Sequence, residues 1–327
     1  MQELSVKSDK APLEAQVSAS VMDPVRAFSP GGITSFFEPY RLRQSQLPRE
    51  ARSAARGGGF TTERGTTTRI TAKRSRSNRI QIFLNKRPAN DCHTTEAVAR
   101  LLLEQTDRRF AVKIEHDVSI PIGAGYGASA AGALSAALAM NELLGLGLTF
   151  DQVGFFAHLA EIRCKTGLGT VGPLMVGGCI LQKEGGPPGI CRIDRIPVRP
   201  SYRIISGCYG PIPTSEVLKS KSVSRRIGKE GRKTMESILS KPSLDNFLHS
   251  SEEFARKIGF MTERIERLIK AARRMGAVGA TQNMLGEAFH AIVEEDQTEE
   301  LLERLRVLMP MSRLFSTAID FEGARLL

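Results

Sequence analysis

Three glycines at alternate positions form the stretch of the chain with the clearest chemical signal. Gly123, Gly125 and Gly127 lie within residues 121–132, and an alanine-rich segment follows directly. Glycine lets a backbone turn tightly and approach a ligand, because no Cβ atom stands in the way. The following segment lacks proline and β-branched residues, so we expect a helix to begin near Ala128. A glycine loop that enters a helix N-terminus binds anions, usually phosphate, through free N–H groups and the helix dipole.

Other glycine motifs fit this loop less well. A Walker loop requires a lysine, and no lysine occurs between Ile120 and Leu144. A Rossmann fingerprint would accept Gly123, Gly125 and Ala128, but it expects a parallel strand that ends in an acid after the helix. This chain instead continues with Gly-Leu-Gly and a second helical pattern. A tight turn that packs against a core helix and binds no ligand stays open as an alternative.

Regular patterns flank the loop on both sides. Residues 110–116 alternate between apolar and polar side chains, as a strand does, and lead into the loop. After the central helix, Thr149 is the candidate N-cap of a helix at residues 151–165. That helix carries His158 and Glu161 three residues apart, so both side chains lie on one face.

The rest of the chain predicts both strands and helices. Expected strands lie at residues 25–37, where a Pro-Gly-Gly turn intervenes, and at 66–71, 79–84, 176–182, 202–206 and 314–319. Expected helices lie at residues 95–104, within 215–274, and at 298–308. We expect a basic loop at 41–56, a close turn at the glycines of 57–59, and a glycine stop for the helix at 166–169.

The densest turn signal, Gly-Gly-Pro-Pro-Gly, lies at residues 185–189 and predicts a domain boundary. We therefore expect a disordered tail at 1–21, a first domain at 22–186 and a second at 187–327. Strands separated by paired helices favour an α+β architecture.

Composition indicates an ordinary globular protein of 327 residues, of which 41% are apolar and 25% charged. No apolar run reaches the ~18 residues of a membrane span, and residues 1–22 lack the apolar centre of a secretory signal. We expect a cytoplasmic protein with no membrane partner. The five cysteines include no C-x-x-C pair, which favours reduced and mostly buried thiols over zinc or disulfides.

Most of the formal charge of +11 lies in one segment, because residues 41–79 contain eleven Lys and Arg against two acids. Such a segment is a solvated loop, a nucleic-acid patch, or the basic wall of a site for anionic substrates. Only Tyr40 and Phe60 accompany the arginines, so stacking on single-stranded nucleic acid is poorly supported.

Four segments of the chain together resemble the GHMP kinase superfamily, which includes galactokinase, homoserine kinase and mevalonate kinase. Residues 121–132 resemble its phosphate-binding motif, P-x-x-x-G-L-G-S-S-A-A. Residues 27–37, 56–60 and 157–169 resemble one branch of the superfamily most closely, the archaeal pantoate kinases. The resemblance covers residues 25–320.

This resemblance implies a two-domain α+β fold, with a left-handed βαβ unit in the N-terminal domain, a ferredoxin-like C-terminal domain, and ATP between them. The implied reaction is Mg²⁺-dependent transfer of the γ-phosphate of ATP to the 4-hydroxyl of pantoate, in archaeal coenzyme A synthesis. We also expect a homodimer. Two alternatives stay open: a sister kinase for homoserine or another small hydroxy acid, and a non-catalytic nucleic-acid-binding protein that uses residues 41–79.

The resemblance also implies roles for single residues. The catalytic residues would be Ser129, Glu161 and Thr170, and Ser129 and Glu161 would hold Mg²⁺ through oxygen. Two structural alternatives are a helix-capping role for Ser129 and an ion pair between Glu161 and Lys165. The residues expected to contact ATP are Pro121, Gly123, Ala124, Gly125, Gly127, Ala128, Ser129 and Ala130.

The implied substrate contacts are His158, Gln182 and Thr214, although His158 also fits an ordinary helix surface. The chain departs from the family at one implied catalytic position and one implied substrate position, and Ala128 replaces the first serine of the phosphate-binding motif. Thr170 replaces an aspartate, a base or metal ligand, and Gln182 replaces a basic residue that meets the pantoate carboxylate. Homoserine kinases also lack the aspartate. An arginine of residues 41–79 could supply the missing charge, because a guanidinium matches a carboxylate. Residues 279–286 lie where the third, glycine-rich motif of the superfamily belongs.

Overall fold

A computed structural model describes residues 21–42, 47–212 and 221–327 of the chain. The described residues form one sheet of eight strands and another of four. The large sheet contains β1 (Val25–Arg41), β2 (Ser53–Arg74), β3 (Arg79–Leu84), β4 (Arg87–Pro88), β5 (Phe110–Val118), β6 (Cys179–Glu184), β7 (Arg192–Ile196) and β12 (Arg325–Leu326). The small sheet contains β8 (Tyr202–Pro211), β9 (Gly279–Gln282), β10 (Gly286–Glu294) and β11 (Leu314–Ala318).

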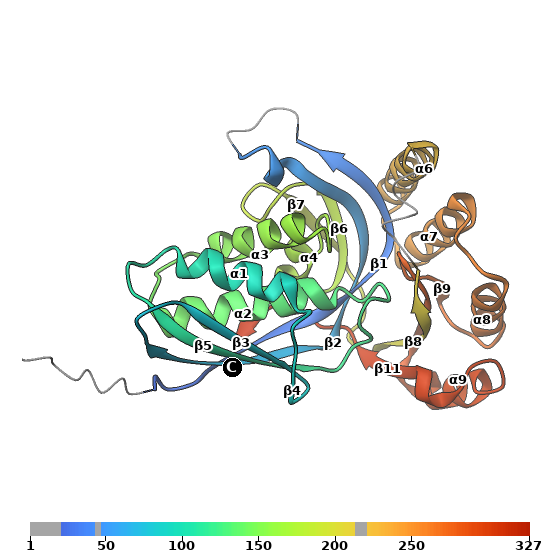
Figure 1. The fold of residues 1–327 in the computed structure, drawn as a ribbon. Helices are drawn as coiled ribbons and strands as arrows, with labels where there is room; N and C mark the ends of the chain where they lie inside the picture. The colour runs from blue at the N-terminus through green and yellow to red at the C-terminus, as the bar shows by residue number, and fades with distance from the viewer. Residues whose placement is uncertain (1–20, 43–46, 213–220) are drawn as a thin grey trace, which may run out of the picture.

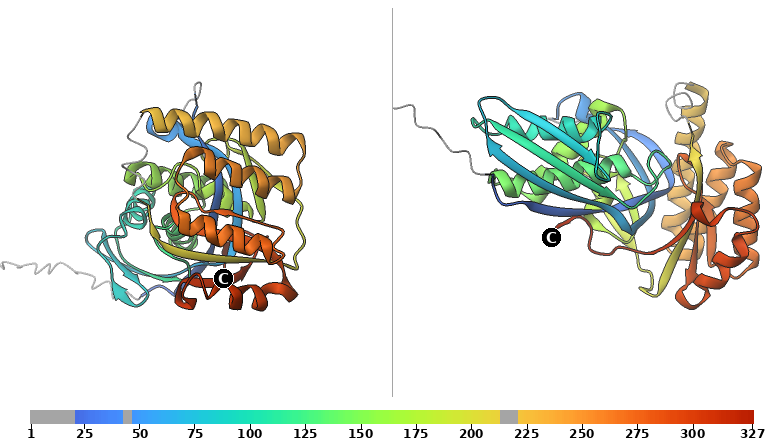
Figure 2. Two further views of the ribbon diagram at one scale, coloured as in Figure 1. Left: turned by 90° about the vertical axis from the view of Figure 1, so that its right-hand side faces the viewer. Right: turned by 60° about the horizontal axis from the view of Figure 1, so that its bottom comes forward.

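Helices cover one face of the small sheet, and they pack on both sides of the strand β1 of the large sheet (Figure 1). Those on the large sheet are α1 (His93–Leu103), α2 (Ala128–Leu144), α3 (Phe150–Cys164) and α4 (Val171–Val176). Those beside the small sheet are α6 (Lys221–Ser240), α7 (Leu244–Ile258), α8 (Glu263–Arg274) and α9 (Thr298–Leu305). Figure 2 shows α6, α7 and α8 stacked side by side. The predicted two-domain α+β architecture is confirmed.

The two longest strands, β1 and β2, pair along almost their whole length, so two predicted turns are wrong. The first, Pro-Gly-Gly at residues 30–32, continues β1 without a turn; the register shift beside it comes from Glu63 and Arg64 of β2, which have no pairing partner in β1. The glycines at 57–59 lie inside β2. A Cβ atom on Gly59 would collide with the carbonyl oxygen of Ile33, so close strand packing, and not a turn, requires glycine there. The expected basic loop also ends early, because β2 begins at Ser53.

A continuous apolar core joins the two halves of the molecule. Phe36 and Phe60 of the large sheet both meet Phe247 of α7 edge-on, with ring centroids 6.0 and 5.4 Å apart. Phe37 meets Phe254 in the same way, at 6.1 Å. Such edge-to-face pairs add to the stabilisation that burial provides. The ends of β1 and β2 are therefore held against α7.

The predicted domain boundary at residues 186 and 187 lies within a hairpin of the large sheet, because β6 pairs with β7. The chain changes sheets between Ile196 and Tyr202, and its last strand, β12, returns to pair with β1. We propose that the second domain begins after Ile196. The turn signal at residues 185–189 marks the hairpin.

The start of α3 agrees with the prediction from the sequence, and its end does not. Oγ1 of Thr149 accepts a hydrogen bond from the Gln152 amide, and Oε1 of Gln152 accepts one from the Thr149 amide, so Thr149 is the N-cap as predicted. At the other end, Lys165 adopts the left-handed conformation, with φ of 57°. Lys165 therefore ends the helix, and the prediction that a glycine of residues 166–169 ends it is wrong.

Replacing Thr149 with alanine is expected to lower the free energy of unfolding by about 1 kcal/mol, because one helix N–H loses its partner. Thr149→Ser keeps the hydroxyl and should retain most of the stability. Urea unfolding of both variants measures this difference. Equal destabilisation by serine and alanine would show that the cap contributes nothing.

Two expectations about the chain as a whole concern membranes and cysteines. None of the helices that the structure describes has the length and apolarity to span a bilayer. All five cysteines lie in described segments and are free thiols, as predicted. Only Cys179 is buried and the other four are half-buried, so the prediction of mostly buried thiols is wrong.

Candidate active site

The glycine loop connects β5 to α2, which begins at Ala128 as predicted. Gly125 and Gly127 have φ of 83° and 66°, a conformation that glycine adopts readily. A Cβ atom on Gly125 would lie 3.1 Å from the Met284 carbonyl oxygen, and one on Gly127 would lie 2.9 Å from Cγ2 of Thr170. The first turn of α2 then offers N–H groups without helical partners, which suits an anion.

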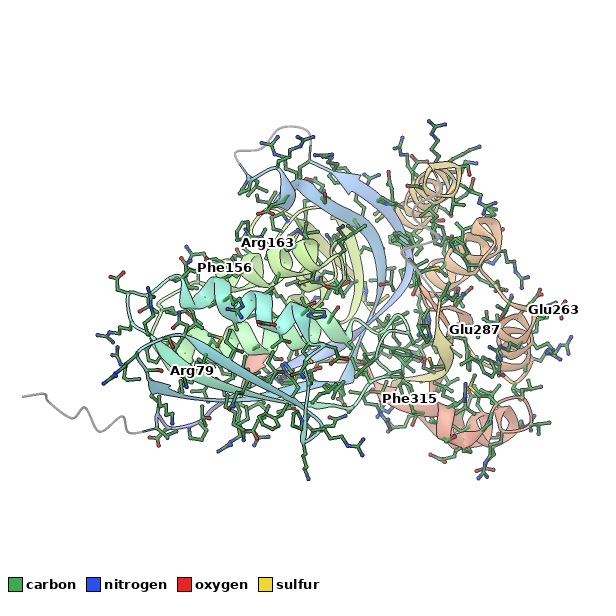
Figure 3. The ribbon with its side chains drawn as sticks, in the orientation of Figure 1. Arg79, Phe156, Arg163, Glu263, Glu287 and Phe315 are labelled. Carbon is green, nitrogen blue, oxygen red and sulfur yellow. The ribbon has the colours of Figure 1, made fainter. Side chains whose placement is uncertain are left out.

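Tyr126 fixes this loop to both sheets. Its ring is buried, and its hydroxyl lies 2.8 Å from Oγ of Ser206, which donates to the carbonyl oxygen of Phe289 at 2.6 Å. Its own carbonyl oxygen accepts a hydrogen bond from the Gly32 amide at 2.9 Å. Phe315, labelled in Figure 3 where the two halves of the molecule meet, packs with its ring centroid 5.7 Å from that of Tyr126. Sequence reasoning missed Tyr126, although an aromatic hydroxyl within a glycine loop was a usable signal.

Ser129 and Glu161 meet beside the loop. Oγ of Ser129 donates to Oε1 of Glu161 at 3.3 Å. The carboxylate is 1% exposed, and burial raises the pKa of Glu161 to about 7. Its other oxygen, Oε2, has no hydrogen-bond partner among the described residues. A buried carboxylate oxygen without a donor is costly unless a cation meets it, so this pair fits a hard divalent ion.

The structure contradicts both structural alternatives for this pair. The N-cap of α2 is Gly127, and no side chain caps that helix, so Ser129 is not its cap. Lys165 lies beyond the end of α3, whereas the Glu161 carboxylate takes its hydrogen bond from Ser129. The described residues contain no group of three or more His, Cys, Asp or Glu suited to a metal. Among the described residues, Glu161 is thus not part of a cluster of such side chains, and phosphate or water oxygens could complete the coordination of an ion.

Thr170, the third residue predicted to be catalytic, lies against the glycine loop. Its Cγ2 atom is 3.4 Å from the position of a Cβ atom on Gly32 and closer still to that on Gly127. It precedes α4 directly and makes no side-chain capping bond. A threonine hydroxyl does not ionise near neutral pH, so this position offers a hydrogen-bonding group but no carboxylate base.

The proposed substrate residues His158 and Gln182 lie close to the first residues of β2. His158 is 1% exposed, so the helix-surface alternative is wrong. Burial lowers the pKa of His158 to about 4, and the backbone of Ser53 and Ala51 offsets this only in part. Nε2 of His158 has no partner among the described residues. Gln182 donates from Nε2 to the Ala55 carbonyl oxygen at 3.0 Å.

Both of these side chains are neutral, and Thr214 lies outside the described residues. Arg56, the arginine next to Ala55, does not supply the missing charge. The side chain of Arg56 forms a hydrogen bond with Glu38 and lies on the face of the strand toward α6. Because neighbouring residues of a strand point to opposite faces, this side chain points away from the face on which Ala55 lies. His158, Gln182 and Arg56 therefore bring no free positive charge to this part of the site.

Comparisons with known proteins cover most of the chain. Residues 93–178, which include the loop, Ser129 and Glu161, match the family description "GHMP kinases N terminal domain". The chain is 28% identical to a pantoate kinase of Methanocaldococcus jannaschii, over 85% of this chain and 96% of the other. It is 29% identical to a pantoate kinase of Thermococcus kodakarensis, over 86% and 91%.

One solved structure is described as a phosphotransferase related to the CoA biosynthesis pathway. It superposes with a TM-score of 0.82 at 25% identity and covers 93% of this chain and 98% of its own. The chain therefore contains a GHMP kinase N-terminal domain and has the GHMP kinase fold. Residues 279–286 pack onto the glycine loop, because a Cβ atom on Gly286 would collide with the carbonyl oxygen of Ala124. The amide of Met284 also donates to the Thr34 carbonyl oxygen at 2.7 Å.

In this kinase, Tyr126→Phe is expected to raise KM for ATP about fivefold, because a buried hydroxyl loses a hydrogen bond that fixes the loop. Tyr209→Phe is the matched control, since it removes a hydroxyl that donates to the Leu308 carbonyl oxygen outside the loop. Steady-state kinetics of both variants measure the effect. An equal change in both variants, or a loss of thermal stability without any change in KM, would contradict the anchoring role.

Proposed function

We propose that this chain is an ATP-dependent kinase that phosphorylates pantoate at its 4-hydroxyl. The observation that carries the proposal is the pairing of Ser129 with the buried Glu161 at the mouth of the glycine loop. Phosphoryl transfer depends mainly on positioning and charge neutralisation, and these residues with the loop N–H groups suit both tasks. The relatives described as pantoate kinases support the choice of substrate, since they align with most of this chain.

We propose that the loop residues 121–130 hold the phosphates of ATP. The pantoate hydroxyl oxygen forms a bond to the γ-phosphorus as the bond from that phosphorus to the bridging oxygen of ADP breaks. The hydroxyl proton passes to a phosphate oxygen or water, because Thr170 cannot accept it as a carboxylate would. A bound Mg²⁺ would offset the negative charge of the phosphates, and Ser129 and Glu161 would hold it.

We propose that His158 and Gln182 bind the substrate through neutral hydrogen-bonding groups. A neutral ring that donates to the backbone at Ala51 or Ser53 leaves the unpartnered Nε2 of His158 as an acceptor for a substrate hydroxyl, whereas the Gln182 amide has a second N–H for the carboxylate. Both side chains are buried, so hydrogen bonds to the substrate would be strong there. Thr214 stays in the proposal as a third contact, outside the described residues.

A sister activity on homoserine is less well supported by these residues. Homoserine carries an ammonium group, and neither His158 nor Gln182 offers a negative charge to it. The nucleic-acid alternative is also disfavoured, because residues 53–74 of the basic segment form β2. The proposal includes a cytoplasmic location, where ATP is available, and a homodimer that light scattering would test.

An ADP-release assay with pantoate, homoserine and mevalonate tests the substrate directly. Pantoate should give a kcat/KM at least about a hundredfold above the others, because unpaired polar groups in a site discriminate strongly. Turnover of homoserine or mevalonate at a similar or higher rate would assign the chain to another GHMP activity. No ADP release with any of them, while ATP still binds, would reject the proposed substrate class.

A further inference from the structure

A pocket of about 920 Å³ lies between α6 and the ends of β1 and β2, away from the phosphate loop. Figure 1 shows α6 beside these strand ends. None of the loop residues, nor Ser129, Glu161 or Thr170, is among the described residues that line it. Its volume lies within the range of small-molecule sites.

The pocket is built around one buried carboxylate that holds two guanidinium groups. Glu38 is 4% exposed, and its Oε2 accepts from Nε of Arg56 at 3.0 Å. Its Oε1 accepts from Nη2 of Arg232, on α6, at 3.2 Å. The Arg56 guanidinium also lies over the Tyr40 ring, 5.4 Å from the ring centroid. Both arginines are thus fixed in position, and one carboxylate faces two cations.

The remaining lining adds more positive charge and an apolar wall. Arg41 and Arg52 also line the pocket, while Glu236 is the other acid among its described lining residues. Four arginines against two glutamates leave the walls cationic. Leu239 of α6 is 45% exposed at the same pocket, so the lining also offers apolar surface.

We propose that this pocket binds a small organic anion that carries two or more phosphate or carboxylate groups and an apolar portion. The anionic groups would bind the guanidinium groups of Arg232 and Arg56. Glu38 accepts hydrogen bonds from Nε and Nη2 of both arginines, so their Nη1 groups can donate to a ligand. The apolar portion would lie on Leu239. Because Arg56 belongs to β2 and Arg232 to α6, the ligand would contact both halves of the molecule. This site is independent of the proposed kinase reaction.

Isothermal titration of the full chain with inorganic pyrophosphate, without Mg²⁺, tests the proposal. Arg232→Gln should weaken pyrophosphate binding about tenfold, since it removes a charged hydrogen-bond donor. Lys229→Gln is the matched control: it makes the same charge change on α6, at a residue that does not line the pocket. The glycine loop is unchanged in both variants, so any pyrophosphate that binds to this loop contributes equally to both titrations.

Wild-type affinity in Lys229→Gln together with weakened binding in Arg232→Gln would support the pocket. Equal binding by the two variants, or no pyrophosphate binding by the wild type, would overturn it. Arg41→Gln, in β1, removes another arginine of the pocket and should also weaken pyrophosphate binding. Thermal unfolding of each variant separates a loss of the ligand from a loss of the fold.

Discussion

Replacing Glu161 with glutamine is expected to lower kcat by about 10²–10³-fold, because the site loses the negative charge that suits a metal ion. Glutamine keeps the shape of the side chain and can still accept the hydrogen bond from Ser129. Binding of the substrate acid should change little, since His158 and Gln182 are untouched. Single-turnover measurements with ATP and pantoate separate this loss of chemistry from any loss of binding.

The same substitution is expected to stabilise the protein above neutral pH in the absence of metal. The pKa of Glu161 is about 7 in the folded protein against an ordinary 4.5, so the folded state binds its proton more tightly than the unfolded state does. Stability should therefore fall as pH rises from about 4.5 to about 7, and this fall should be absent in Glu161→Gln. Urea unfolding across this range measures it. If Glu161→Gln is less stable than the wild type above pH 7, the claim that the buried Glu161 carboxylate lacks a partner is wrong.

Replacing Ser129 with alanine is expected to lower kcat by about tenfold to a hundredfold, less than the loss of Glu161. Ala128 occupies the position of the first serine of the superfamily motif, so Ser129 provides the hydroxyl in this turn of α2. Its removal takes a ligand from the proposed metal and a hydrogen bond from Glu161. Kinetics at several Mg²⁺ concentrations should show a higher metal requirement.

Ser129→Thr is the control for this second variant, because it keeps the hydroxyl on the same helix turn. It should recover most of the activity that alanine loses. If alanine raises KM for ATP and leaves both kcat and the Mg²⁺ requirement unchanged, Ser129 binds nucleotide only and does not belong to a metal site.

Local signals predicted the parts of the molecule that depend on neighbouring residues. The glycine loop and the start of α2 follow from composition, and the Thr149 cap follows from a four-residue pattern. The sequence also identified Ser129 and Glu161, through the resemblance of their motifs. Their contact at 3.3 Å agrees with a shared site, while their chemical roles stay predictions.

Features that depend on distant residues could not be predicted in this way. Pro-Gly-Gly at residues 30–32 resembles a turn, but pairing with β2 carries β1 through it. The contact of Tyr126 with Ser206 joins the glycine loop to β8 of the small sheet, and no spacing in the chain indicates that partner. The same holds for the clamp of Glu38 on Arg232, because α6 lies far from β1 in sequence.

Phosphorus NMR of the product formed from ATP, Mg²⁺ and pantoate tests the central claim most directly. The account predicts one new phosphate ester on the 4-hydroxyl of pantoate, formed in equal amount to ADP, and a strongly reduced rate in Glu161→Gln. Inorganic phosphate as the only new product, or an ester that forms equally fast in Glu161→Gln, would contradict the claim that the glycine loop, Ser129 and Glu161 form a pantoate kinase site.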